Sequence, residues 1–181
     1  MSLEPFPERV DPRKLFTRNG EVNGVVALSR LKRLGHYLSN ENGQVEASLR
    51  FGRDESKQRL VSGSLKGNVQ MLCQRCLSET TVELATELYV VVLGNTDKGN
   101  ERARELLAND IDAVQVDEDD LDVLSLIEDE LILGLPIVVM HAEKDCNNEL
   151  NRLNVEAVEA ASTEVKPSAF AGLATLKKDL Q

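Results

Sequence analysis

Aromatic residues are scarce: they make up 3% of the 181 residues, and tryptophan is absent. A chain of this length can nevertheless bury a sizeable core in one domain. With so few rings, that core must be built mainly from valine, leucine, isoleucine and alanine. We therefore expect one domain with extensions, packed through aliphatic side chains.

Long apolar runs and export signals are also missing. No run reaches the roughly 18 apolar residues that a membrane-spanning helix needs. The first residues, Met1–Pro7, lack the basic and apolar blocks of a signal peptide. Three cysteines without such a signal favour reduced thiols over a disulfide framework. These features predict a soluble cytoplasmic protein with no membrane partner.

The familiar catalytic motifs are absent. The sequence has no G-x-S-x-G, no phosphate-binding glycine loop and no H-E-x-x-H. Carboxylates are so abundant that pairs of acids occur by chance, and the run Asp117–Asp120 lacks the ligand rhythm and glycine of an EF-hand. The sequence therefore predicts a protein that is not an enzyme, with an RNA-processing nuclease as an alternative.

Charge is abundant and unevenly distributed. The formal net charge is -10. Up to Leu60 the chain has eleven basic and eight acidic residues, whereas from Val61 onward it has ten basic and twenty-three acidic residues. Nucleic acid repels an acidic protein at long range. Contact with RNA must therefore be local, through the basic front, or must pass through a basic partner protein.

Two charged groups are candidate contact surfaces. The candidate RNA or ribosome contacts are Arg13, Lys14, Arg18, Arg30, Lys32 and Arg33. The candidate contacts to a basic partner are Asp117, Glu118, Asp119 and Asp120. Each group also has a simpler interpretation: a solvated helix face for the basic residues and a hydrated loop for the acidic ones.

Hydrophobic periodicity predicts β-strands over about residues 20–93. The alternation is clean in residues 44–51, where every second side chain is apolar. Gly63 and Gly67 interrupt a later run, which predicts bulges or sharp bends. Successive antiparallel strands with short links favour a curled or barrel-like antiparallel β-meander.

Helices are expected on either side of these strands, which makes the fold class α+β. A short helix should begin at a Ser29 cap and run to Leu38, and another should cover residues 101–109. Residues 110–135 read as an acidic loop and then a helix, capped by Asp119 or Asp120.

The expected domain organisation has three parts. Residues 1–145 form one core domain with an N-terminal arm, which includes a helical turn near residues 12–16. Residues 146–166 are polar and form a linker. Residues 167–181 form an amphipathic C-terminal helix that docks on the core.

The cysteines give the most informative pattern. Cys73 and Cys76 form a C-x-x-C pair between two alternating runs, which places them at the tip of a β-hairpin. Such a pair is consistent with half of a zinc site, a redox pair or two small buried hydrophobes. Together with His141 and Cys146 it makes a set of four candidate zinc ligands. A metal-free structural cluster is favoured over zinc, and redox chemistry is disfavoured because no thioredoxin-like βαβ pattern occurs.

Several blocks occur together in one order. They are Cys73-Gln74-Arg75-Cys76-Leu77, Glu128–Pro136, His141 with Cys146, and Pro167–Lys177. In this order they resemble the bacterial YceD family, whose members are called large ribosomal RNA subunit accumulation proteins. Relatives outside this branch of the family often carry a second cysteine pair where this chain has only His141 and Cys146.

The resemblance implies a non-enzymatic cytoplasmic factor for the accumulation or processing of large-subunit (23S) ribosomal RNA. Its expected partners are the precursor of that RNA, basic ribosomal proteins, or both. A purely structural zinc-binding module is a further alternative.

Overall fold

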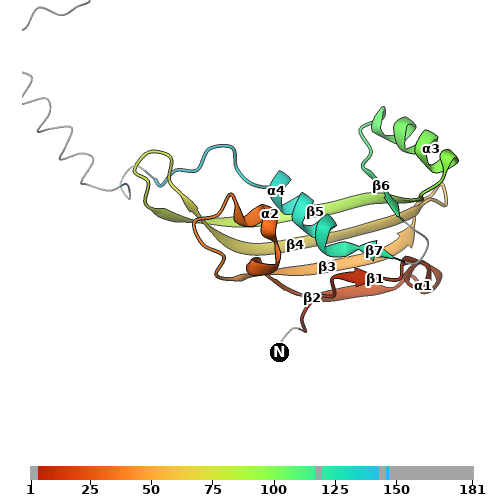
Figure 1. Ribbon diagram of the computed structural model, residues 1–181, viewed down its shortest axis with the longest axis horizontal. Helices are drawn as coiled ribbons and strands as arrows, with labels where there is room; N and C mark the ends of the chain where they lie inside the picture. The colour runs from red at the N-terminus through yellow and green to blue at the C-terminus, as the bar shows by residue number, and fades with distance from the viewer. Residues whose placement is uncertain (1–3, 117–119, 143–145, 147–181) are drawn as a thin grey trace, which may run out of the picture. The chain divides into compact units, whose positions relative to one another are not determined.

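The computed structural model describes residues 4–116, 120–142 and 146. Residues Met1–Met140 form one compact unit, in which helices cover one face of a β-sheet (Figure 1). The elements in chain order are β1 (Arg9–Val10), α1 (Pro12–Arg18), β2 (Glu21–Ala27), the 3₁₀ helix η1 (Leu28–Arg30), α2 (Lys32–Gly35), β3 (Gln44–Arg53), β4 (Arg59–Leu72), β5 (Glu79–Gly94), α3 (Asp97–Leu107), β6 (Ala113–Val116), β7 (Leu121–Asp122) and α4 (Val123–Leu133). Among the described residues, no helix is long and apolar enough to cross a membrane.

The main sheet has the strand order β2-β3-β4-β5-β6. Its first four strands form an antiparallel meander, as expected for the α+β class. The sheet stays open, with β2 and β6 at its two ends, so it does not close into a barrel. Strand β6 pairs in parallel with the end of β5 after the crossover through α3. The loop expected in this part of the chain is therefore wrong for Ala113–Val116, which form a strand.

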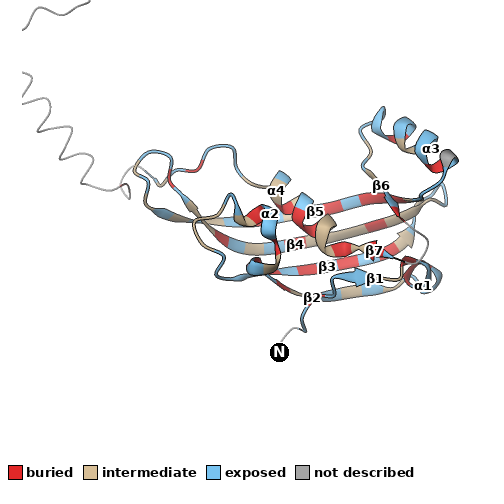
Figure 2. Ribbon diagram, viewed as in Figure 1, coloured by how far each residue is buried: buried red, intermediate tan, exposed pale blue. Residues whose placement is uncertain are grey.

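The core lies between the sheet and the helices. Inward side chains of β3 alternate strictly with exposed ones, which produces the banded pattern of Figure 2. Phe51 of β3 meets Phe16 of α1 edge to face, with 5.5 Å between ring centroids. Most other core side chains are aliphatic, as the composition predicts.

The expected bulges at Gly63 and Gly67 do not occur. Strand β4 keeps one uninterrupted register with β3 and with β5 through both glycines. These glycines allow close packing instead: a Cβ at Gly63 would overlap Ser48 O and lie 2.6 Å from Leu49 Cδ2. The close approach of β3 therefore leaves no room for a side chain at Gly63.

Two expected helix starts are also wrong. Residues 28–35 form η1 and then α2, whose N-cap is Leu31 and not Ser29. The N-cap of α4 is Asp122, whose carboxylate accepts from the Ser125 N–H at 2.9 Å, so the expected cap at Asp120 is wrong. Asp119, the other expected cap, lies outside the described residues. The expected end of α4 is confirmed at Gly134.

The N-terminal arm is tied to the core at several points. Asp11 caps α1 by accepting from the backbone N–H groups of Arg13 and Lys14. Strand β1 pairs with β7 directly before α4. Apart from Cys146, the predicted linker (residues 146–166) and C-terminal helix (residues 167–181) lie outside the described residues.

Candidate functional site

The β4–β5 hairpin ends in a tight turn that carries the cysteine pair. The Cys73 N–H donates to Ser78 O at 2.9 Å, and the Leu77 N–H donates to Cys73 O at 2.8 Å. Leu77 has φ 60, in the left-handed region that leucine rarely adopts. This constrained turn places Cys73 in a buried position and Cys76 in a half-buried one, so the predicted hairpin tip is confirmed.

The chain after α4 returns to this turn. The Gln74 N–H donates to Val139 O at 2.9 Å, and Gln74 Nε2 donates to Ile137 O at 3.2 Å. Val139 itself is buried. These contacts fix the backbone two residues before His141, which explains how residues far apart in sequence meet.

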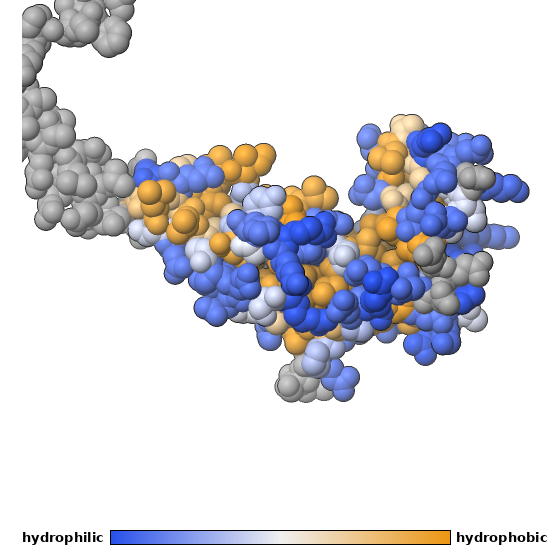
Figure 3. Space-filling model, in the orientation of Figure 1, coloured by the Kyte–Doolittle hydropathy of each residue, from blue (hydrophilic) through white to orange (hydrophobic). Residues whose placement is uncertain are grey.

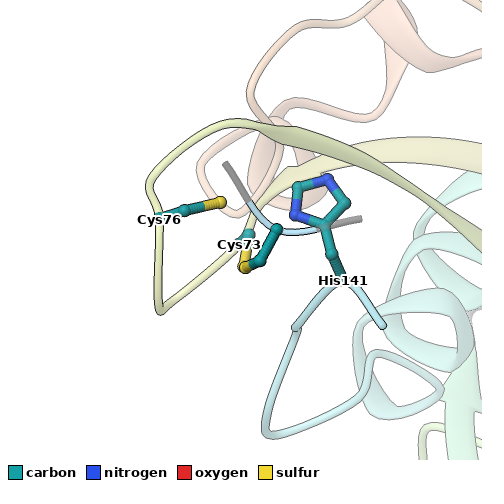
Figure 4. A group of neighbouring side chains, drawn as sticks. Cys73, Cys76 and His141 are labelled. Carbon is teal, nitrogen blue, oxygen red and sulfur yellow. The ribbon is translucent and has the colours of Figure 1, made fainter. Parts of the chain in front are cut away.

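Four side chains of metal-binding type gather at the turn. One ligand atom from each of Cys73, Cys76, His141 and Cys146 lies within 4.8 Å of the others. Figure 4 shows Cys73 and Cys76 on the hairpin turn and His141 on the returning segment. The predicted grouping of these four candidate ligands is therefore present in the structure.

This cluster fits the donor set of a structural zinc site. Zinc favours four tetrahedral ligands with Zn–S distances of about 2.3 Å and Zn–N distances of about 2.0 Å, which puts neighbouring donors roughly 3.5–3.8 Å apart. The observed limit of 4.8 Å is close to that spacing. Cys73 and Cys146 are buried and Cys76 and His141 half-buried, and four protein donors are the number that a structural zinc site uses.

The predicted basic surface is largely occupied by carboxylates. Arg33 Nε donates to Glu128 Oε2 at 2.9 Å, and Arg33 NH1 donates to Asp129 Oδ1 at 2.6 Å. The hydrogen bond to Glu128, followed by that to Asp129, raises the pKa of Arg33 above its already high ordinary value. Arg33 therefore holds α2 against α4.

Arg30 and Lys32 have acidic surroundings as well. Arg30 NH1 donates to Phe6 O at 2.8 Å, and its other terminal nitrogen lies 3.8 Å from Glu8 Oε2. Lys32 lines a shallow hollow of about 220 Å³ together with Glu8 and Glu128. The structure brings these basic residues beside the start of α4 and not onto an open basic face.

The remaining basic candidates lie on α1. Lys14 Nζ is 3.0 Å from Asp11 Oδ2, which is the helix cap. Arg13 and Arg18 are exposed on the same short helix. All three basic residues of α1 are therefore exposed to solvent.

One member of the acidic run has a defined role. Asp120 accepts two hydrogen bonds from Arg9, both at 2.6 Å. This contact lowers the pKa of Asp120 and raises that of Arg9. Asp117, Glu118 and Asp119 lie outside the described residues.

Sequence reasoning missed Glu128, which is the one buried charged residue in the described part of the chain. A signal existed, because Glu128 follows Ile127 and precedes Leu131 by three positions, at the border of the buried stripe of α4. A carboxylate at such a position needs partners inside the fold.

Comparison with known proteins assigns the family. The family model described as "Large ribosomal RNA subunit accumulation protein YceD" matches residues 61–177. The chain belongs to the YceD family. A relative from Haemophilus influenzae with the same description is 30% identical over 179 residues, covering 98% of this chain and 99% of the relative. No solved structure matches this YceD-family chain.

Proposed function

We propose that this protein is a non-enzymatic ribosome biogenesis factor that promotes the accumulation of large-subunit ribosomal RNA. The observation that carries the proposal is family membership, since the match to the YceD model spans the cysteine turn, α4 and His141. The factor acts in the cytoplasm, where bacterial ribosomal RNA is made and assembled with protein. It works as a recognition scaffold that binds precursor RNA, a basic ribosomal protein, or both.

The charge distribution supports a protein partner in particular. A net charge of -10 disfavours broad contact with RNA, and Arg9, Arg30 and Arg33 are engaged with carboxylates or backbone. The exposed basic residues of α1 are the proposed local contact to RNA. An acidic body is suited to the basic proteins of the ribosome.

We assign zinc a structural role in this scaffold. Zinc held by Cys73, Cys76, His141 and Cys146 would cross-link the hairpin turn to the segment that follows α4. A closed site with four protein ligands supplies folding free energy and leaves no position for a substrate. The proposal therefore requires no catalytic step.

Depletion of the protein in its host cell tests the role. We expect a lower ratio of large- to small-subunit ribosomal RNA, and recovery on re-expression. Capture of the full chain from extract at low salt should recover ribosomal proteins or precursor RNA. An unchanged RNA ratio together with capture of neither partner would overturn the proposal.

A matched pair of variants tests the RNA contact on α1. The triple variant Arg13→Ala, Lys14→Ala and Arg18→Ala should reduce recovery of precursor RNA. The control Arg50→Ala, Arg53→Ala and Lys57→Ala removes equal charge near the β3–β4 turn and should retain it. Equal losses in both variants would indicate a nonspecific charge effect.

A further inference from the structure

Within the described residues, strand β5 has a long edge without a partner strand. On one side it pairs with β4 from Glu79 to Val91, whereas on the other side β6 pairs only with Val91–Gly94. In the described ranges of the chain, no strand pairs with residues 79–90 on that second side. Figure 1 shows β6 beside only the last part of β5. An unpaired edge of this length is a template for another strand.

The backbone groups that face this edge can be identified. The Val91 N–H donates to Asp112 O at 2.9 Å, so the backbone of Val91 faces the β6 side. Successive residues of a strand alternate the side to which their N–H and C=O groups point. Because the register with β4 is uninterrupted, Glu87, Ala85 and Glu83 present their N–H and C=O groups to the open edge.

The charge of the edge selects the kind of strand that it can accept. Glu83 and Glu87 are exposed on the face away from the helices, and no lysine or arginine occurs within β5. Their direct partners across β4, Asn68 and Ser64, are uncharged, and Lys66 of β4 lies opposite Ala85, between the two carboxylates. Opposite charges on neighbouring strands stabilise a sheet. An incoming strand with lysine or arginine beside these two carboxylates is therefore favoured.

One pairing of this edge with a second copy of the chain is disfavoured by charge. Antiparallel pairing of two β5 edges centred on Ala85 would place Glu83 of one copy opposite Glu87 of the other, twice over. Like charges directly opposite each other destabilise strand pairing. The charge of the edge therefore favours a different and basic segment over this pairing of two copies.

Exposed apolar side chains flank the end of α4, which lies against β5. Gly134, at the end of α4, packs directly against Thr86 on the helix-covered face of β5. Next to it, Leu133 is 77% exposed, and Ile137 is 95% exposed. Figure 3 shows hydrophobic residues among hydrophilic ones on the face of the molecule that it draws. An added strand in which basic residues alternate with apolar ones would place the two kinds on opposite faces.

We propose that the open edge of β5 captures an extended basic segment of a partner protein as an additional β-strand. Backbone hydrogen bonds to Glu83, Ala85 and Glu87 provide the affinity, and the two carboxylates select a basic sequence. The inference rests on the proposed function in one respect: ribosomal proteins are the proposed source of such segments.

The test uses the full chain and short synthetic peptides. A peptide of lysine alternating with valine should bind at a ratio of one to one and slow hydrogen exchange at the N–H groups of Glu83, Ala85 and Glu87. A glutamate–valine peptide is the negative probe. Ala85→Pro removes one outward N–H without removing a bond to β4, and should weaken binding about tenfold, whereas Ala85→Ser keeps the donor and should bind normally.

Charge variants complete the test. The double variant Glu83→Lys and Glu87→Lys should lose the lysine peptide, while Glu55→Lys with Glu101→Lys makes the same change of net charge elsewhere and should retain it. Binding that both double variants weaken equally, or that Ala85→Pro leaves unchanged, overturns the proposal. The proposal is also overturned if the chain forms a dimer and the Ala85→Pro variant does not.

The outcomes also separate this inference from the proposed function. Peptide binding at β5 without any capture of ribosomal proteins or RNA would leave the edge intact as a site and remove the ribosomal role. Equal capture of ribosomal proteins by Ala85→Pro and the unaltered chain would leave the ribosomal role intact and remove the β5 edge as the binding site.

Discussion

Glu128 of α4 caps the N-terminus of α2, a helix that has no capping side chain of its own. Its Oε1 accepts from the Arg33 N–H at 2.6 Å and from the Leu34 N–H at 3.1 Å. The first N–H groups of a helix have no partners within that helix, so a carboxylate from elsewhere satisfies them. Glu128 Oε2 then accepts from the Arg33 side chain. One buried carboxylate thus joins two helices that are far apart in sequence.

The first prediction concerns the removal of this carboxylate. Glu128→Ala should lower the free energy of unfolding by about 2–3 kcal/mol, because two N–H groups lose their acceptor in a largely buried place. Asp129→Ala is the control, since its salt bridge with Arg33 is exposed and worth less than about 1 kcal/mol. Urea unfolding measures both. Equal losses would contradict the capping role.

Patterns carried by neighbouring residues made the hairpin predictable. Alternation around Cys73 and Cys76 is visible within a short window, and so is the apolar stripe of α4 with its stop at Gly134. The grouping of His141 with the cysteines was also predictable, because few residue types bind zinc and only two histidines occur.

Features that depend on tertiary contacts were not predictable in this way. Strand β6 is short, and it is a strand because it pairs with the end of β5. The packing at Gly63 depends on Ser48 and Leu49 of the neighbouring strand. Arg33 looks like a surface cation in the sequence, and only the fold places Glu128 beside it.

The second prediction follows from the close strand packing at Gly63. Gly63→Ala should destabilise the protein by about 1–3 kcal/mol, because the new methyl group would meet the backbone of Ser48 and the side chain of Leu49. Gly52→Ala is the matched control in the neighbouring strand, where a Cβ would have no atom within 4 Å. Thermal unfolding of the two variants checks the difference, and a Gly63→Ala protein as stable as the control would refute the close packing.

The third prediction concerns the dependence of stability on pH. The hydrogen bond from Arg9 lowers the pKa of Asp120 below its ordinary value of 3.8. The ionised Asp120 carboxylate therefore stabilises the fold above pH 3.8, and this stabilisation is lost as the pH falls through the lower pKa of the folded state. Asp120→Asn should destabilise the protein at neutral pH and have progressively less effect below pH 3.8, as measured by urea unfolding.

Glu130 should show the opposite sign and serves as the comparison. Burial, followed by the nearby charge of Asp112, raises the pKa of Glu130 above its ordinary value of 4.5. Its ionised form therefore opposes folding above the raised pKa, and this cost is removed as the pH falls. Glu130→Gln should stabilise the protein at neutral pH, with the gain disappearing below pH 4.5. A stability gain that does not vary with pH would contradict this account.

The fourth prediction tests the metal. Freshly purified protein should contain about one zinc ion per chain, and a strong chelator should lower its Tm by roughly 5 °C or more, because a structural metal contributes folding free energy. Cys73→Ser and His141→Asn should each remove most of the zinc. Elemental analysis of the purified variants, together with thermal unfolding, provides the measurement.

The two histidines supply the control that makes this prediction decisive. His36 directly follows α2, and it is not a member of the cysteine–histidine cluster. His36→Asn makes the same chemical change as His141→Asn, so it should retain both the zinc and the response to chelator. If zinc content is negligible in the unaltered chain, the cluster is a metal-free packing arrangement of buried thiols. In that case Cys73→Ser would act through lost packing alone, and its effect on Tm would not depend on chelator.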